Sequence, residues 1–443
     1  MKIRSIPSKT LLALALTTAM STAYATNGYF SHGYGVKAKG MGGAAVAMTH
    51  DAFAGANNPA AAAFAGNRWD AGVELFSPRR ATSRAGSDFT AFGGMPGQLD
   101  GSVDSDKTMF VIPEFGYNLA LSNDIGLNLT VYGNGGMNTE YPGGTFGCPP
   151  AGGANALCGA GRLGVNMMQL IVAPTLAYKV APDHAIGVSP LFVYQQFEAY
   201  GLQAFTQNPM WSVSSSNITN RGVDDSTGLG VRIGYLGKLS PMVSVGASYS
   251  PKIDMKEFGK YKGLFAGGGD FDIPQNSTIG FAVQASPALQ IALDYQTIKY
   301  SGVSSVGNPS ANFFTAQLGS SNGPGFGWQD VNVMKLGLQY QMDSTWTLRA
   351  GYNKGDNPIR AQDVTFNILA PGVVEDHYTL GATMAIDKNS ELSFFYMHAK
   401  EVKVTGGSMF GPLFSGDPTS AAGGMETIKM YQNSIGLQYS KRF

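Results

Sequence analysis

Short turns alternate strictly with long loops from about residue 68 to the end of the chain, and this pattern constrains the fold most. The short connections lie at residues 122–124, 181–184, 240–241, 286–288, 343–344 and 387–390. The long connections, rich in Gly, Ser and Asn, lie near residues 80–106, 140–161, 205–225, 257–272, 304–327, 357–375 and 405–428. Six short turns and seven long loops in alternation require 14 connected segments, with both ends on the short-turn side.

The connected segments alternate in hydrophobicity with a period of two. In "IGLNLTVY", four aliphatic residues from Ile125 to Val131 share one face, and "STIGFAVQA", "TWTLRAGYN" and "HYTLGATMAI" repeat the pattern. Such alternation indicates β-strands with one apolar face. We expect the strands to begin near Arg68, Lys107, Ile125, Arg162, Asp183, Val223, Met242, Asp270, Ala288, Gly327, Ser344, Glu375, Ser390 and Ile428.

The asymmetry of the connections is typical of outer-membrane barrels, which have short turns at one end, long loops at the other and an even strand count. Closing the sheet leaves no unpaired edge in lipid. Only 14% of the 443 residues are charged, against roughly 25% in soluble chains. A secreted β-solenoid or sandwich would need a repeating period that we do not find. The sequence therefore predicts an all-β fold, a 14-stranded antiparallel transmembrane β-barrel over residues 68–443, ending in the aromatic Phe443.

The N-terminus carries an export signal. Lys2, Arg4 and Lys9 precede an apolar run over residues 11–19, and residues 23–25, Ala-Tyr-Ala, match a signal-peptidase site. A retained membrane anchor would need a longer apolar run. We expect a signal peptide over residues 1–25.

Since the charges of 30 basic and 30 acidic residues cancel, the chain has no net electrostatic field that would attract nucleic acid.

The two cysteines of the chain, Cys148 and Cys158, are close together in a Gly- and Pro-rich loop. In an exported chain such a pair predicts a disulfide. A metal site would need further Cys or His nearby, and none is present. We expect no metal and no cofactor.

Residues 26–67 lack the alternation of the strands. Gly and Ala dominate this segment, with Met41, Met48 and Phe53 spaced among them. Small residues permit close packing of backbones, and the lumen of a 14-stranded barrel is too wide for its own side chains to fill. Either this segment fills the lumen, or the protein is an open pore.

The sequence resembles the FadL family of outer-membrane transporters for long-chain fatty acids and other hydrophobic compounds. The resemblance rests on Asn58-Pro59-Ala60, preceded by Gly40 and Gly43, and on "VYGNGGMNTEYPGGTFG" over residues 131–147. It implies that residues 26–67 form a small, mainly helical hatch in the barrel of a monomer in the bacterial cell outer membrane. It also implies that a ligand moves from an external apolar groove to a lumen pocket and leaves sideways at a kink in the third strand.

Candidate residues exist for each part of this route. The kink corresponds to Gly133, Asn134, Gly135 and Gly136, since glycine inside a strand marks a bulge or bend, although a simple strand end is the alternative. The external groove corresponds to Phe205, Met210, Trp211, Leu264 and Phe265 on two long loops, although these side chains could instead pack on one another.

The period-two pattern places three cations on the face of their strands that points into the lumen: Arg232, Lys335 and Arg349. Each is a possible partner of a fatty-acid carboxylate, and pairing with Asp294 or another lumen acid is the alternative. Apolar pockets discriminate weakly between hydrophobic ligands, so the pattern leaves fatty acids, alkanes and monoaromatics open.

Two other functions remain open. A general porin for small solutes would have an open, charged lumen. An enzyme housed in a barrel, such as a lipase, would need a nucleophile motif, and none accompanies the five histidines. No nucleotide-binding Gly loop followed by Lys-Ser/Thr occurs either. We therefore expect passive transport of a hydrophobic small molecule. Besides this ligand, the expected partner of the protein is the lipid of the outer membrane.

Overall fold

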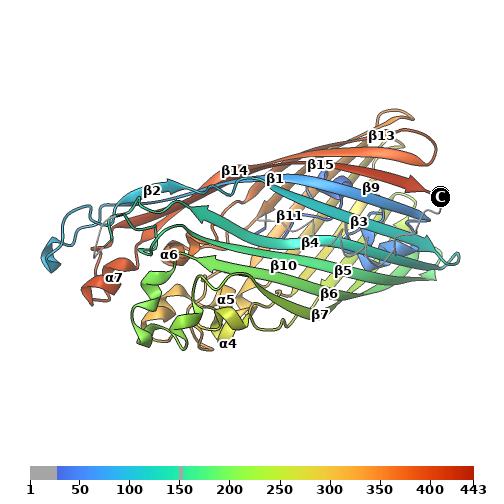
Figure 1. Cartoon of the computed structure of the whole chain (residues 1–443). Coiled ribbons are helices and arrows are strands. Elements are labelled where there is room, and N and C mark those ends of the chain that lie inside the picture. The colour runs from blue at the N-terminus through green and yellow to red at the C-terminus, as the bar shows by residue number, and fades with distance from the viewer. Residues whose placement is uncertain (1–26, 149–152) are drawn as a thin grey trace, which may run out of the picture.

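The computed structural model describes residues 27–148 and 153–443, and the predicted signal peptide lies outside them (Figure 1). All its strands belong to one antiparallel sheet. The strands are β1 (Arg68–Ala85), β2 (Gly101–Asp104), β3 (Phe110–Ala120), β4 (Ile125–Tyr141), β5 (Leu163–Ala181), β6 (His184–Tyr200), β7 (Asp224–Ser240), β8 (Val243–Ser250), β9 (Asn276–Gln284), β10 (Leu289–Ile298), β11 (Val331–Gln341), β12 (Trp346–Gly355), β13 (Asp376–Ala385), β14 (Ser390–Gly407) and β15 (Met425–Arg442).

The helices are short. The α-helices are α2 (Val36–Lys39), α3 (Ala54–Asn57), α4 (Ala266–Gly269), α5 (Ser304–Gly307), α6 (Val364–Asn367) and α7 (Phe410–Ser415). The 3-10 helices are η1 (Pro59–Ala63), η2 (Thr90–Phe92), η3 (Gln203–Thr206), η4 (Pro209–Trp211), η5 (Ser215–Asn217), η6 (Gly259–Tyr261), η7 (Tyr300–Gly302), η8 (Ser310–Phe314) and η9 (Ala361–Asp363). Within the described residues, no helix has the length and apolar character needed to cross a membrane.

The sheet closes on itself. β15 pairs with β1 along both strands, from Arg68 opposite Arg442 to Ala85 opposite Met425. Among the described residues, β2 pairs only with the outer part of β1, so the other 14 strands of the 15-stranded sheet form the wall. This confirms the predicted 14-stranded antiparallel barrel. Figure 1 shows the C-terminus at the short-turn end and α4 to α7 among the long loops at the opposite end.

Most strands begin within a few residues of the predicted positions, and two differences have a physical cause. β9 begins at Asn276 rather than near Asp270, because the carboxylate of Asp272 accepts hydrogen bonds from the preceding loop and holds this segment away from the wall. β11 begins at Val331 rather than Gly327, because the intervening residues turn into the barrel. The short strand β2 within a long loop was not predicted.

The two faces of the wall differ as the period-two pattern requires. Outward side chains such as Leu127, Leu338 and Leu437 are exposed and apolar, whereas Asp294 and Asn353 point inward and are buried. An apolar outer face and a polar inner face suit a barrel surrounded by lipid.

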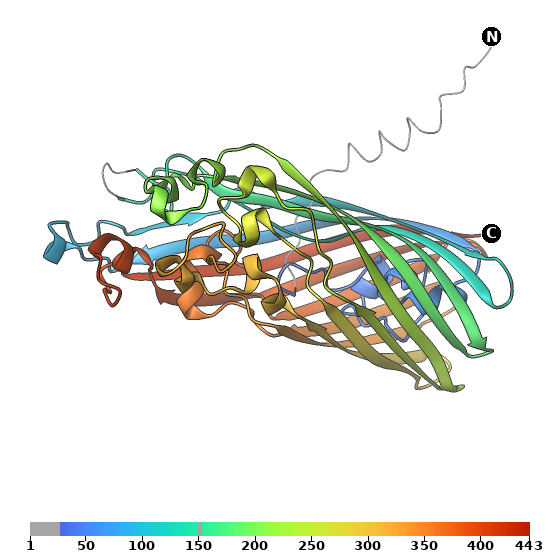
Figure 2. The same ribbon diagram turned by 90° about the horizontal axis from the view of Figure 1, so that it is seen from below.

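Residues 27–67, which we call the hatch, lie inside the barrel toward the short-turn end (Figures 1 and 2). Its helical parts are α2, α3 and η1, and turns connect them. Glycines on the wall let the hatch approach closely: a Cβ atom added to Gly246 would lie 2.1 Å from the carbonyl oxygen of Val46. The other wall glycines with a hatch atom within 3.2 Å of such a Cβ are Gly116, Gly126, Gly135, Gly187, Gly234, Gly280, Gly337, Gly351, Gly355 and Gly381. The hatch is therefore packed backbone against backbone.

We expect Gly246→Val to displace the hatch. Overpacking a filled interior costs about 1–3 kcal/mol, which corresponds to roughly a fivefold to hundredfold larger population of the displaced state. Single-channel conductance in planar bilayers should therefore show frequent open events. Gly407→Val is the matched control, because Gly407 is exposed and a Cβ added there meets nothing within 4 Å. Equal conductance of both variants would contradict tight packing at Gly246.

Candidate functional site

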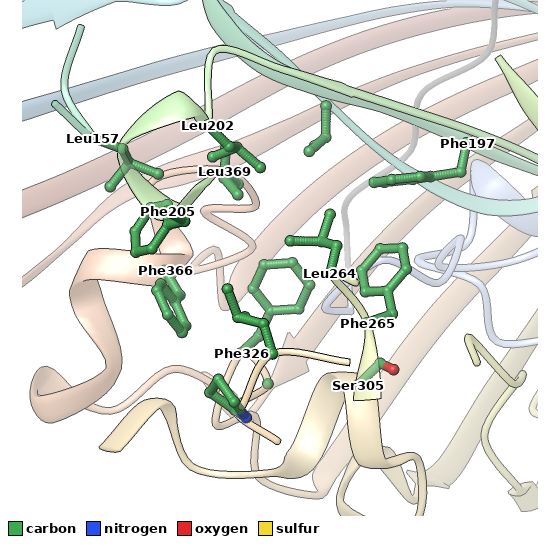
Figure 3. Close-up of a pocket in the computed structure, with 14 residues that line it drawn as sticks. Leu157, Phe197, Leu202, Phe205, Leu264, Phe265, Ser305, Phe326, Phe366 and Leu369 are labelled. Carbon is green, nitrogen blue, oxygen red and sulfur yellow. The ribbon is translucent and has the colours of Figure 1, made fainter. Parts of the chain in front are cut away.

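An apolar pocket lies among the long loops (Figure 3). Its walls come from β5 and β6 and from the loops that follow β4, β6, β8, β10 and β12. The lining residues are Leu157, Val165, Phe197, Leu202, Phe205, Leu264, Phe265, Ser305, Leu318, Pro324, Gly325, Phe326, Phe366 and Leu369. We call this the external pocket; apart from Ser305, its lining carries no polar side chain.

The free volume of the external pocket is about 50 Å³. An engineered protein cavity that holds benzene measures ~150 Å³. The pocket is therefore nearly closed, and its aromatic side chains must move apart before a ligand can occupy it.

The structure brings three of the five predicted groove residues together. Phe205, Leu264 and Phe265 line the external pocket. Trp211 packs on an aromatic ring beside it, with ring centroids 5.7 Å apart. Met210 lies outside the pocket and is 73% exposed.

Sequence reasoning missed the contribution of the loop after β12. Phe366 reaches the pocket from α6, and Leu369 reaches it from just after the end of that helix. The signal was present, because these two residues are three apart within "VTFNIL", an apolar stretch in an otherwise polar loop. Phe326 comes from a Gly-rich segment that has no such pattern.

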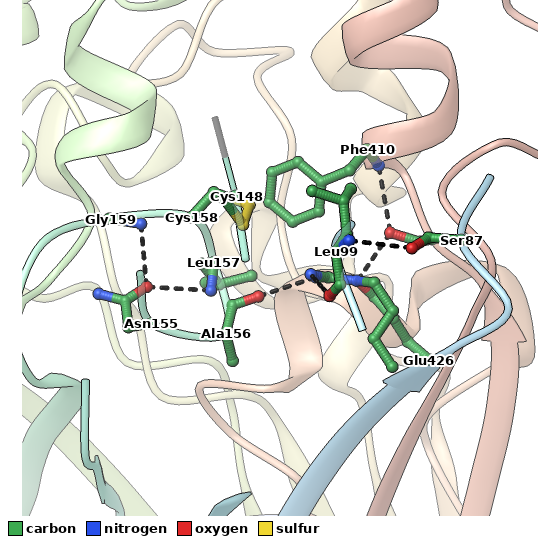
Figure 4. The surroundings of a disulfide bond; sticks show 12 residues. Ser87, Leu99, Cys148, Asn155, Ala156, Leu157, Cys158, Gly159, Phe410 and Glu426 are labelled. Carbon is green, nitrogen blue, oxygen red and sulfur yellow. Dashed lines mark hydrogen bonds and ion pairs between the residues drawn. A yellow bond between two sulfur atoms is a disulfide. The ribbon is translucent and has the colours of Figure 1, made fainter. Parts of the chain in front are cut away.

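Cys148 and Cys158 form a disulfide, as predicted (Figure 4). The disulfide loop presents Leu157 to the external pocket. Arg84 on β1 donates to a backbone carbonyl of this loop at 2.8 Å and also binds the carboxylate of Glu426 on β15, with Nε 2.9 Å from Oε1. A buried ion pair at the outer end of the wall thus fixes the loop that closes one side of the pocket.

The pairing between β3 and β4 stops partway along the wall, and we call the unpaired stretch between these strands the opening. These strands pair only from Ala120 opposite Gly126 to Phe115 opposite Val131. Beyond this point, among the described residues, β3 continues to pair only with β1, and β4 continues to pair only with β5. A bulge in β4 between Gly133 and Gly135 accompanies the separation.

The hatch occupies the inner side of this opening. Phe30 forms an isolated bridge with Gly135, and the backbone N–H of Gly136 donates to the carbonyl of Tyr29 at 3.3 Å. A Cβ added to Gly135 would lie 2.1 Å from that same carbonyl oxygen. The predicted gate, residues 133–136, is thus the part of β4 that bends inward and bonds to the hatch.

Aromatic rings connect the external pocket with the opening. Phe265 of the pocket lies 5.0 Å from Phe271, which lies 6.0 Å from Tyr29, measured between ring centroids. Tyr29 in turn lies 5.9 Å from Trp328. Both Tyr29 and Trp328 line a small cavity beside the opening, together with Met137 of β4. The side chains that link the two sites are aromatic, and Arg80, Asn138 and Thr139 add polar groups to the small cavity.

The sequence matches the family described as outer membrane protein transport protein (OMPP1/FadL/TodX) over residues 12–440. The chain belongs to this family. It is therefore an outer-membrane transport protein for hydrophobic compounds and not an enzyme. In barrels of this kind the short turns face the periplasm. No curated protein sequence matches the chain.

Solved structures share the fold. The toluene transporter TodX of Pseudomonas putida is 18% identical, with a TM-score of 0.65 over 93% of this chain and 99% of its own. A FadL homologue of Pseudomonas aeruginosa is 15% identical, with a TM-score of 0.67 over 94% and 100%. The toluene transporter TbuX of Ralstonia pickettii is 17% identical, with a TM-score of 0.62 over 93% and 99%.

The signature Asn58-Pro59-Ala60 of this FadL/TodX family member shapes the hatch. The side chain of Asn58 accepts from the backbone N–H of Ala60 at 3.1 Å, which caps η1, and Pro59 occupies the first position of that helix. The same amide donates to the carbonyls of Val46 at 2.7 Å and Tyr235 at 2.8 Å. Asn58 therefore joins two parts of the hatch to the wall strand β7.

The three predicted apolar hatch residues, Met41, Met48 and Phe53, are all buried. Met41 packs against Gly337 of β11, and Phe53 packs against Gly35 within the hatch. They fill the space that the small residues leave.

The three predicted cations bind the hatch and the wall. Arg232 donates to the hydroxyl of Tyr132 at 3.1 Å and to a hatch carbonyl, Lys335 donates to the carbonyl of His32 at 3.0 Å, and Arg349 donates to side chains of neighbouring strands. None of them lines the external pocket. Among residues 27–148 and 153–443, no cluster of three His, Cys, Asp or Glu side chains could hold a metal ion.

A buried charge cluster anchors α2 of the hatch. The ammonium of Lys39 lies 2.6 Å from the carboxylate of Glu74 and 3.2 Å from that of Glu114. Burial alone would lower the pKa of Lys39, but the carboxylates of Glu114 and Glu74 raise it above its usual range. The lysine is therefore charged, and each of the three groups depends on the others.

We expect Lys39→Met to lower the free energy of unfolding by about 3–5 kcal/mol, because it leaves two buried carboxylates without a cation. Chemical denaturation in lipid vesicles, followed by tryptophan fluorescence, measures this loss. The triple variant Lys39→Met, Glu74→Gln, Glu114→Gln removes all three charges and should recover most of it. If the Lys39→Met protein is as stable as the wild type, the cluster does not anchor the hatch.

Proposed function

We propose that this protein carries uncharged hydrophobic molecules, hydrocarbons rather than fatty acids, passively from the external pocket to the side opening between β3 and β4. The observation that carries the proposal is the composition of the external pocket, where all lining side chains except that of Ser305 are apolar. Burial of apolar surface, worth about 25 cal/mol per Å², then supplies the affinity.

Electrostatics favours neutral ligands at this pocket. A carboxylate buried without a partner is costly, and no cation lines the external pocket. Arg232 and Lys335 are buried deeper in the lumen, where they bind the hatch. A role for these cations toward a fatty-acid carboxylate would require the hatch to release them first. Toluene, which the similar TodX and TbuX carry according to their names, has the chemistry that the pocket favours.

The exit at the side opening has its own support. The aromatic rings from Phe265 to Tyr29 lead toward the opening, whereas a straight path to the periplasm meets the buried charges and the packed backbone of the hatch. Because the opening faces the lipid, an apolar ligand that leaves there does not return to water. A gradient is sufficient to drive this movement.

We expect Leu264→Asp to reduce toluene uptake by about tenfold or more, because an unpaired charge in the pocket costs about 1–3 kcal/mol of ligand binding. Uptake of radiolabelled toluene and of oleate by cells lacking other uptake routes measures the effect. Met210→Asp is the control, since Met210 is exposed on a neighbouring loop. Unchanged uptake at normal surface expression would contradict the pocket, and better uptake of oleate than of toluene by the wild type would contradict the neutral-ligand preference.

We expect the double variant Gly135→Val, Gly136→Val to disrupt the inward bend of β4, because a side chain on Gly135 collides with the carbonyl of Tyr29. Toluene uptake should then fall severalfold, while toluene binding to the purified protein, measured by tryptophan quenching, should persist. Loss of binding together with uptake would indicate a folding defect. Normal uptake at normal surface expression would exclude exit through this opening.

A further inference from the structure

A second cavity gathers cations that the transport route does not use. It lies at the outer part of β1, β14 and β15 beside the connection between β2 and β3, and its volume is about 280 Å³. Three cations line it: Arg79 and Arg80 of β1, and Lys429 of β15. We call it the rim cavity.

The cations of the rim cavity lack anionic partners. Among the described residues, none of the three forms an ion pair, whereas Glu401, which also lines the cavity, pairs with Lys403 at 3.2 Å. The remaining lining carboxylate is Asp104. Three cations therefore face one carboxylate that is not already neutralised.

Arg80 shows the imbalance most clearly. It is 6% exposed, its guanidinium donates only to the backbone carbonyls of Asn138 and Lys107, and its Nε has no hydrogen-bond partner in the described structure. A buried guanidinium without an anion is unfavourable. Arg80 also lines the small cavity beside the opening between β3 and β4, so the rim cavity borders the exit.

The strand pairing places a further lysine beside Lys429, and Glu401 neutralises only that lysine. Lys403 lies directly opposite Lys429 in the pairing of β14 with β15. Like charges opposite each other destabilise a sheet unless an anion lies between or beside them. The hydroxyls of Ser105, Thr108 and Tyr431 also line the rim cavity and can donate hydrogen bonds to such an anion.

The rim cavity lies at the level where lipid headgroups meet the barrel. Along β15, the outward side chains Leu437 and Ile435 are apolar and exposed, the polar Asn433 and then Tyr431 follow, and Lys429 comes next toward the external loops. Along β1, exposed Leu75 precedes exposed Arg79. An apolar band that ends in an aromatic residue and then a cation is typical of the membrane interface.

We propose that the rim cavity binds a phosphate group of an outer-leaflet lipid, a phosphorylated glycolipid whose acyl chains lie along β1 and β15. The phosphate supplies the anion that the outward-facing Arg79 and Lys429 lack, and basic pockets at the interface bind such headgroups. The bound headgroup lies beside Arg80, the inward-facing neighbour of Arg79, and Arg80 joins β1 to β4 through the carbonyl of Asn138. This site does not depend on which compound the protein transports.

The test uses the full mature protein in mild detergent and measures binding of bisphosphorylated lipopolysaccharide by native mass spectrometry. We expect the double variant Arg79→Gln, Lys429→Gln to bind it about thirtyfold more weakly, since each interfacial cation contributes roughly a factor of five. Lys388→Gln is the matched control, because Lys388 is an exposed cation in a turn at the opposite end of the barrel. It should bind like the wild type.

Three results would overturn the proposal. The first is equal binding of the double variant, with its native fold verified by heat-dependent migration in gels. The second is equal binding of the dephosphorylated lipid by the wild type. The third is displacement of the lipid by inorganic phosphate at a concentration equal to that of the lipid, which would indicate a site for the free anion.

Discussion

The close contact between the backbone of the hatch and the glycines of the wall is the constraint on which the rest of the structure depends. A 14-stranded barrel is too wide to be filled by its own side chains, and side chains on the wall would hold the hatch several ångströms away. At Gly40 and Gly381, glycine lies on both sides of the contact. Because the lumen is filled to this density, a straight path to the periplasm would cross the packed hatch, and this is why the proposed exit is the side opening.

The same contact explains how a wall in lipid can have an opening at all. Unpaired strand edges are costly where no water reaches them. β4 exchanges its missing partner β3 for the hatch, whose Tyr29 carbonyl and Phe30 backbone bond to Gly136 and Gly135. The opening and the hatch are thus one unit, and a displacement of the residues around Tyr29 changes both the aromatic barrier and the hydrogen bonds that hold the kink.

The sequence predicted those features that depend on local patterns. Period-two alternation and turn composition located 14 strands, and the spacing of Cys148 and Cys158 indicated the disulfide. Features that depend on pairing between distant segments were not visible, because register is a property of two strands. Neither the early end of the pairing between β3 and β4 nor the contribution of Phe326 to the pocket follows from a single segment alone. The inward parity of Arg232 and Lys335 was recognisable, but their engagement by hatch carbonyls was not.

Polar and apolar interactions are separated along the axis of the barrel. The packed hatch and the Lys39 charge cluster fill the periplasmic half, and aromatic rings fill the region between the loops and the opening, whereas the buried Arg84–Glu426 pair lies at the outer end of the wall. On the proposed route, a ligand that enters the external pocket must separate rings such as Phe205 and Phe265, and it replaces their contacts with its own. A planar or flexible hydrocarbon can do so at little net cost, whereas a carboxylate would in addition lose its hydration. On the proposed route, selection at this pocket would rest on polarity first and on shape only weakly.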